Sequence, residues 1–226
     1  MNIDILQGKT TEHLVLLEGT KCFIHNLMLT DFLRLQKDAL KEGFDLKIIS
    51  AFRDYDRQLK IWNLKASGER PLLDDQERPL EFSKLSPIEI IMAILRWSAL
   101  PGSSRHHWGS DIDVYDAKTQ KEDEVKLVPS ETMNHGPAAR LHEWLDLKIS
   151  SDSSYGFYRP YATDRGGVSP ERWHLSYYPI SRRYLESYTF SLFKKNIEES
   201  DLILKETVLE NADEIFRRFF LNVDVP

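Results

Sequence analysis

Short apolar stretches alternate with polar, turn-rich ones in the first third of the chain and predict a mixture of strands and helices. The runs HLVLLEG and KCFIH are separated by a glycine and a threonine, which indicates a hairpin. Apolar positions at helical spacing predict a helix in residues 29–44, with Gly43 as its stop. The β-branched run at 46–52 predicts a central strand, and residues 53–69 follow with a helical pattern.

A long polar segment and a strong helix-start signal come next. Residues 68–86 are polar and contain two prolines, which predicts a loop. The sequence SPIE at residues 86–89 has serine as N-cap, proline at the first helical position and glutamate at the third. We therefore expect a helix that begins there and ends at Pro101 and Gly102.

The second half of the chain continues the mixed pattern. Polar and apolar residues alternate in DIDVYDA, which predicts a strand with Asp111 and Asp113 on one face. A helix is expected in residues 137–150, a strand in 172–177 and helical structure from Ser181 onwards. Because strands and helices are mixed rather than strictly alternating, the pattern favours the α+β class.

Composition narrows the range of partners. The chain has 226 residues, enough for one well-packed domain, and its net charge of −6 disfavours nucleic acid as the main partner. No apolar run approaches the roughly 18 residues that would span a bilayer, so no membrane association is expected. The N-terminus lacks the basic and apolar regions of a secretory signal. We therefore expect a cytoplasmic protein as the sequence is written, or a periplasmic one if a leader was trimmed.

The stretch SRHHWGSDID contains the residues with the strongest chemical signal. A turn followed by a strand can bring His106 and Asp113 together, and both are residue types that bind zinc. A third ligand would be His174 in PERWHLS, with Glu171 three residues earlier as a general base. The residues alone leave open a metal site and a polar loop whose histidines bond to backbone groups.

Three segments resemble motifs of one enzyme family. SRHHWGSDID resembles the S-x-H-x-x-G-x-A-x-D signature of the D-alanyl-D-alanine carboxypeptidase (VanY-type) metallopeptidases, which share a fold with the hedgehog signalling domain. PERWH matches the E-x-W-H half of the signature, and SAFRDYDRQ is similar to the family's S-G-Y-R-S-x-x-x-Q segment. The matches occur in the expected order and cover residues 45–180. The resemblance implies a small antiparallel sheet flanked by helices.

Carried over position by position, the resemblance also implies the roles of individual residues. It predicts one zinc ion, held by His106, Asp113 and His174. Glu171 would activate water and pass its proton to the leaving amine, and Arg53 would stabilise the oxyanion or hold the substrate's terminal carboxylate.

Three further residues are expected near the substrate. The resemblance implies that Ser104 and Gln58 donate hydrogen bonds to the peptide end. Asp111 departs from the pattern, which has a small alanine at that position. It is a candidate for binding a cationic group of the substrate, for accepting a hydrogen bond from a ligand imidazole, or for competing as a ligand.

The expected function is zinc-dependent removal of a terminal residue from a short, peptidoglycan-derived peptide of a bacterial cell wall, by D,D- or L,D-carboxypeptidase activity. The alternatives are a murein stem-peptide endopeptidase and a non-catalytic, hedgehog-like binding module that contains zinc. We expect a zinc peptidase domain in residues 1–180 and a helical C-terminal extension, packed on the same domain, in residues 181–226. The sequence leaves the oligomeric state open.

Overall fold

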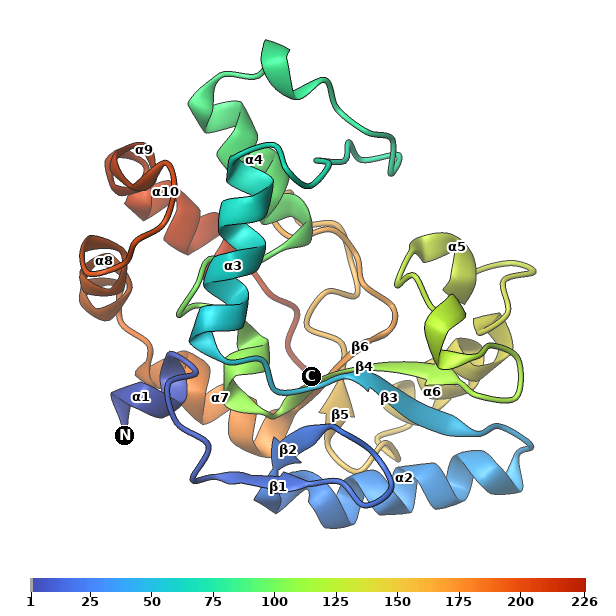
Figure 1. Cartoon of the computed structure of the whole chain (residues 1–226). Helices are drawn as coiled ribbons and strands as arrows, with labels where there is room; N and C mark the ends of the chain where they lie inside the picture. The colour runs from blue at the N-terminus through green and yellow to red at the C-terminus, as the bar shows by residue number, and fades with distance from the viewer. Residues whose placement is uncertain (1) are drawn as a thin grey trace.

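A four-stranded antiparallel sheet forms the centre of the protein in a computed structural model that describes residues 2–226 (Figure 1). The strand order is β3-β4-β6-β5, and a separate pair, β1 and β2, forms an antiparallel hairpin. The strands are β1 (Leu14–Leu16), β2 (Phe23–His25), β3 (Leu46–Ser50), β4 (Asp111–Asp116), β5 (Phe157–Tyr158) and β6 (His174–Tyr177). This arrangement of a small antiparallel sheet with flanking helices confirms the predicted α+β class.

Helices surround the sheet. They are α1 (Ile3–Leu6), α2 (Leu29–Lys41), α3 (Tyr55–Ala66), α4 (Pro87–Trp97), α5 (Pro129–Thr132), α6 (Ala139–Ser150), α7 (Tyr178–Ser187), α8 (Phe190–Glu198), α9 (Lys205–Glu210) and α10 (Ala212–Ile215). A π-helical turn, Phe216–Leu221, follows α10. Among residues 2–226, no helix has the length and apolar character needed to cross a membrane.

The helix-start signals work as the sequence predicts. The side chain of Asp54 accepts a hydrogen bond from the backbone N–H of Arg57 at 2.7 Å and caps α3. Pro87 is the first residue of α4, and the carboxylate of Glu89 accepts from the backbone N–H of Ser86 at 2.8 Å. Helix α7 begins at Tyr178, so helical structure starts three residues earlier than expected.

Register in the sheet brings distant residues together. In the antiparallel pair β4–β6, Asp113 lies opposite His174 and Asp111 lies opposite Ser176. Residues two apart on a strand share a face, so both aspartates of β4 face the same side of the sheet. An irregularity between Ile48 and Ser50 shifts the register where β3 meets this end of β4.

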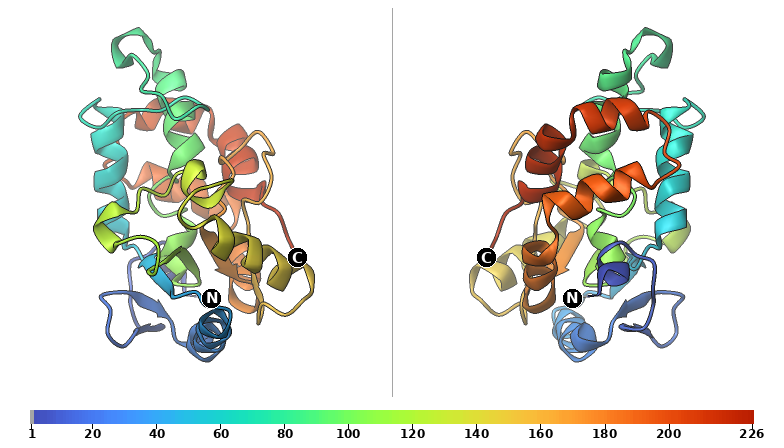
Figure 2. Two further views of the ribbon diagram at one scale, coloured as in Figure 1. Left: turned by 90° about the vertical axis from the view of Figure 1, so that its right-hand side faces the viewer. Right: turned by 90° about the vertical axis from the view of Figure 1, so that its left-hand side faces the viewer.

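The C-terminal helices lie at the end of the molecule opposite α5 and α6 (Figure 2). The indole N–H of Trp62, on α3, donates to the carbonyl of Ile203 at 2.9 Å. The amide of Asn196 donates to the carbonyl of Pro101 at 2.7 Å, and the hydroxyl of Tyr188 donates to that of Gly102 at 2.6 Å. The C-terminal segment therefore supports the turn that directly precedes SRHHWGSDID. Helix α7 crosses the boundary expected at residue 180, and the division into 1–180 and 181–226 stays a prediction.

Candidate metal centre

Three side chains from three different elements converge at one end of the sheet. His106 lies in the 3₁₀ turn Arg105–Trp108, Asp113 in β4 and His174 in β6. One ligand atom from each lies within 4.8 Å of the other two. Nε2 of His106 is 3.4 Å from Oδ2 of Asp113, and Nδ1 of His174 is 3.3 Å from Oδ1 of Asp113. These are the three residues that the sequence predicts as metal ligands.

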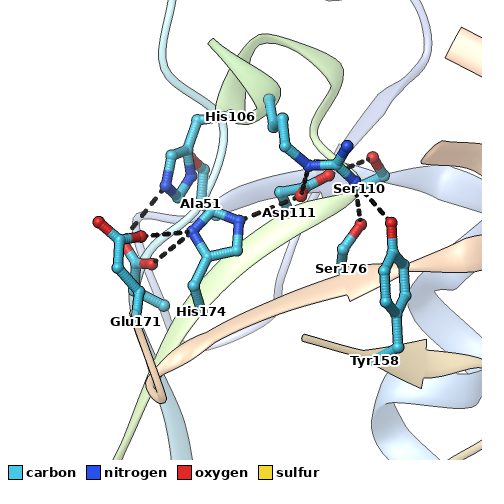
Figure 3. A network of polar contacts seen from close by, with 10 residues as sticks. Ala51, His106, Ser110, Asp111, Tyr158, Glu171, His174 and Ser176 are labelled. Atoms are coloured by element: carbon cyan, nitrogen blue, oxygen red, sulfur yellow. Dashed lines mark hydrogen bonds and ion pairs between the residues drawn. The ribbon is translucent and has the colours of Figure 1, made fainter. Parts of the chain in front are cut away.

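Hydrogen bonds behind the two imidazoles set which nitrogen faces the centre. Nδ1 of His106 lies 3.0 Å from the carbonyl oxygen of Ala51, and a carbonyl only accepts, so Nδ1 carries the proton and Nε2 has a free lone pair. Nε2 of His174 lies 3.1 Å from Oδ1 of Asp111 and donates to it, which leaves Nδ1 free (Figure 3). Both free nitrogens point towards Asp113.

The donor set fits a zinc ion. Oδ1 of Asp113 and Nδ1 of His174 are buried and make no hydrogen bond among the residues that the structure describes. Buried polar atoms are normally paired, so two such orphans side by side indicate a missing partner. Two imidazole nitrogens and a carboxylate oxygen are ligands that zinc takes, and three protein ligands leave a position open in a catalytic site.

Charge states at the centre favour binding of a cation. Burial lowers the pKa of His106 to about 3, so its imidazole is neutral. Burial alone raises the pKa of Asp113, but the neighbouring His106 and His174 outweigh this and lower it to about 2. Burial likewise lowers the pKa of His174, yet the carboxylates around it raise that pKa well above its usual value. These carboxylates therefore stabilise positive charge at this position, and a bound metal ion would replace the proton on Nδ1.

A buried ion pair, Arg105–Asp111, supports the centre from behind. Nε of Arg105 donates to Oδ1 of Asp111 at 2.8 Å, and its side chain also donates to the hydroxyls of Ser176 at 2.7 Å and Tyr158 at 3.0 Å. The hydroxyl of Ser110 donates to Oδ2 of Asp111 at 2.8 Å. The side chains of Arg105 and Asp111 are 3% and 0% exposed. The ion pair is therefore enclosed by protein.

The contacts of Asp111 separate the three roles that the sequence leaves open. Its carboxylate receives hydrogen bonds from Arg105, Ser110 and His174, and it does not line the cavity beside the centre. The structure places Asp111 behind His174, where it orients the imidazole, and binding of a substrate cation by Asp111 stays a prediction.

Glu171 lies beside the three predicted ligands. Its Oε2 is 3.3 Å from Nδ1 of His174, and its backbone N–H donates to the carbonyl of Tyr161 at 2.9 Å. Burial raises the pKa of the Glu171 carboxyl above its usual value. A carboxyl group with a raised pKa at the edge of a cavity holds a proton more readily than an exposed one, which suits a general acid–base group.

Arg53 also reaches the cavity, held by residues behind it. Its guanidinium donates to Oε1 of Gln58 at 2.9 Å, and the amide of Gln58 donates to the carbonyl of Ala99 at 2.7 Å. Gln58 is buried and does not line the cavity, so in this structure it orients Arg53, and its hydrogen bond to a substrate stays a prediction. Nδ1 of His107 donates to the carbonyl of Arg53 at 2.6 Å and fixes its backbone.

The centre opens into a cavity of about 470 Å³. Of the side chains that the sequence places near a substrate, Ser104 and Arg53 line it, whereas Gln58 and Asp111 do not. The sequence reasoning missed Tyr161, which lines the cavity with its ring edge-on to His174 at 5.1 Å between centroids. It also missed Arg105, which occupies a variable position of the signature and therefore gives no signal of its own.

The family model for VanY, D-alanyl-D-alanine carboxypeptidase, matches residues 21–180. The chain belongs to this family. Two uncharacterized proteins of Haemophilus influenzae are related to this VanY-family chain. One is 43% identical over 100 residues, covering 43% of this chain and 68% of the relative. The other is 21% identical over 125 residues, covering 54% of this chain and 93% of the relative.

Solved structures with the same fold include peptidases. VanYB in complex with D-Alanine-D-Alanine has a TM-score of 0.52 and 20% identity, and covers 86% of this chain and 87% of its own. A mutant of the vancomycin resistance D,D-pentapeptidase VanY in complex with Zn(II) has a TM-score of 0.52 and 21% identity, with coverages of 88% and 92%. The LdcB LD-carboxypeptidase also has a TM-score of 0.52 and 21% identity, with coverages of 86% and 76%.

Proposed function

We propose that this VanY-family chain is a zinc-dependent carboxypeptidase that hydrolyses a peptide bond near the C-terminus of a short, peptidoglycan-derived peptide. The observation that carries the proposal is the buried group of His106, Asp113 and His174 with the carboxylate of Glu171 beside it, at the edge of a cavity. Membership of the family and the shared fold with VanYB bound to D-Alanine-D-Alanine support the choice of substrate.

The zinc ion would be held by Nε2 of His106, a carboxylate oxygen of Asp113 and Nδ1 of His174. When bound, zinc acts as a Lewis acid on a carbonyl group and makes water a stronger nucleophile at neutral pH. Asp111 accepts the Nε2–H of His174 and keeps that ring in the orientation that directs Nδ1 towards Asp113.

Glu171 moves the proton of the reaction. Its carboxylate accepts a proton from water as the water oxygen forms a bond to the carbonyl carbon. It returns that proton to the amide nitrogen as the C–N bond breaks, so the products are a carboxylic acid and an amine, and Glu171 is ionised again. The guanidinium of Arg53 stabilises negative charge on the carbonyl oxygen, an effect worth about 2.7–4 kcal/mol per donor in other enzymes.

The proposal predicts the products from defined stem peptides. With zinc-loaded protein, we expect a pentapeptide or a tetrapeptide stem to lose a single C-terminal residue, because the proposed chemistry acts at the terminal bond. Mass spectrometry of the products, with paired stems that end in a D,D- or an L,D-bond, measures the specificity. Cleavage inside the stem would identify an endopeptidase, and stoichiometric zinc binding without cleavage of any peptide would favour a binding module.

A further inference from the structure

Five cationic side chains line the cavity beside the metal centre. Arg105 is paired with Asp111, and the other four are Arg53, Lys65, Arg70 and Lys126. Acidic residues outnumber basic ones in the chain, 36 to 30, yet none of these four side chains lies within 4.0 Å of a carboxylate among the described residues. Elsewhere a comparable cation is paired, since Arg96 contacts both Asp75 and Asp164. These four cations therefore have no carboxylate in direct contact, and the carboxylates that also line the cavity belong to Glu77, Asp113 and Glu171.

Lys65 lies on the same helix as the residue that holds Arg53. Gln58, which holds Arg53, and Lys65 are seven residues apart on α3, with Ile61 between them, and such positions share one helix face. Seven residues of helix rise roughly 10 Å. An extended peptide advances roughly 3.3 Å per residue, so about three residues cover that distance. From Arg53, which Gln58 holds beside the metal centre, about three peptide residues along α3 therefore reach the position of Lys65, and Ile61 and Lys65 both line the cavity.

The surroundings of Lys65 strengthen any interaction with an anion. Its ammonium donates to the hydroxyl of Ser98 at 2.7 Å, and its side chain is partly buried. Burial, with smaller contributions from Arg70 and Arg53, lowers the pKa of Lys65 to about 8. An ammonium that is partly desolvated and surrounded by other cations gains more from a carboxylate than an exposed lysine does.

We propose that Lys65, with Arg70 and Lys126 beside it in the same cavity, forms a subsite for a carboxylate that the substrate carries about three residues N-terminal to the scissile bond. This inference rests on the proposed carboxypeptidase function. If only one residue lies on the C-terminal side of the scissile bond, only the N-terminal part of the peptide is long enough to reach Lys65. With such a subsite, the protein would prefer a peptide with a free carboxylate at this position over the same peptide with a carboxamide there. Among the described residues, Glu77 is the one acidic side chain that lines the cavity besides Asp113 and Glu171 of the metal centre.

The test compares two peptides that differ only at this position, one with a free carboxylate and one with the corresponding carboxamide. We expect the wild-type protein to prefer the acidic peptide about tenfold in kcat/KM, mainly through KM, which corresponds to about 1.4 kcal/mol. The variant Lys65→Met should lose this preference and cleave both peptides at the wild-type rate for the carboxamide. The control Lys60→Met changes an exposed lysine on the same helix and should keep the full preference.

Two kinds of result would contradict these expectations, and they separate failure of the subsite from failure of the proposed function. Equal cleavage of the two peptides by the wild type, or a full preference in Lys65→Met, would overturn the subsite. If the wild type cleaves neither peptide, the proposed function fails, and calorimetric binding of both peptides to the zinc-loaded protein then tests the subsite on its own. Tighter binding of the acidic peptide that is lost in Lys65→Met supports the subsite, and equal binding of the two peptides overturns it.

A second variant keeps the test decisive if Lys65→Met folds poorly. Arg70→Gln changes an exposed side chain and should reduce the preference for the acidic peptide about threefold.

Discussion

Replacing Glu171 with glutamine should reduce kcat by about 10³-fold or more and leave zinc binding unchanged. Glutamine has nearly the same shape but cannot accept the proton of water, and general acid–base groups contribute roughly 10²- to 10⁴-fold to rates. The carboxylate lies 3.3 Å from Nδ1 of His174 but is not one of the three predicted ligands. The measurement is the rate of stem-peptide cleavage together with the zinc content of the purified variant.

A matched control separates this effect from a general loss of charge. Glu143 lies exposed on α6 and does not line the cavity, so Glu143→Gln should retain wild-type activity. Full activity of Glu171→Gln would contradict the proposed role of this carboxylate. Loss of zinc together with activity would show that Glu171 holds the metal centre together instead of moving a proton.

Replacing Arg105 with methionine should destabilise the protein by about 3–5 kcal/mol, because it leaves the carboxylate of Asp111 buried without its counter-charge. The pair lies 2.8 Å apart, with side-chain exposures of 3% and 0%, so water cannot substitute for the lost guanidinium. The free energy of unfolding in urea, measured on the metal-free protein, gives the size of the effect.

An exposed pair provides the comparison. Arg182 and Glu186 lie 2.7 Å apart on α7 but are 59% and 60% exposed. Arg182→Met should therefore change the free energy of unfolding by about 1 kcal/mol or less. Similar losses in Arg105→Met and Arg182→Met would contradict the view that Arg105 neutralises a buried charge beneath the centre.

The sequence was most informative where a pattern is long or a motif is dense. Helices of ten or more residues repeat their apolar positions often enough to be recognised, as α2 does, whereas α1, α5 and β5 have two to four residues and carry no periodic signal. The His106–Asp113 spacing and the alternation in β4 indicated that these residues share a site. The structure brings them together through the register that pairs Asp113 with His174, which no local pattern encodes.

Two residues that the sequence places near the substrate contact other protein groups in the structure. Gln58 falls within a family-like segment, but its amide supports Arg53 and Ala99 instead of facing the cavity. Asp111 shares a face with Asp113 as predicted, and only the buried Arg105 next to it shows why a second carboxylate is tolerated there. Whether a side chain supports another residue depends on which hydrogen bonds and ion pairs it makes in the folded protein. Residue type and spacing along the sequence do not contain that information.

The central claim is that His106, Asp113 and His174 form a zinc site. Crystals of the zinc-loaded protein, with diffraction data collected on both sides of the zinc absorption edge, test it most directly. We predict one anomalous peak, bonded to Nε2 of His106, a carboxylate oxygen of Asp113 and Nδ1 of His174, with Asp111 still hydrogen-bonded to Nε2 of His174. A fully loaded protein whose zinc lies elsewhere, or whose three side chains do not meet at the ion, would contradict it.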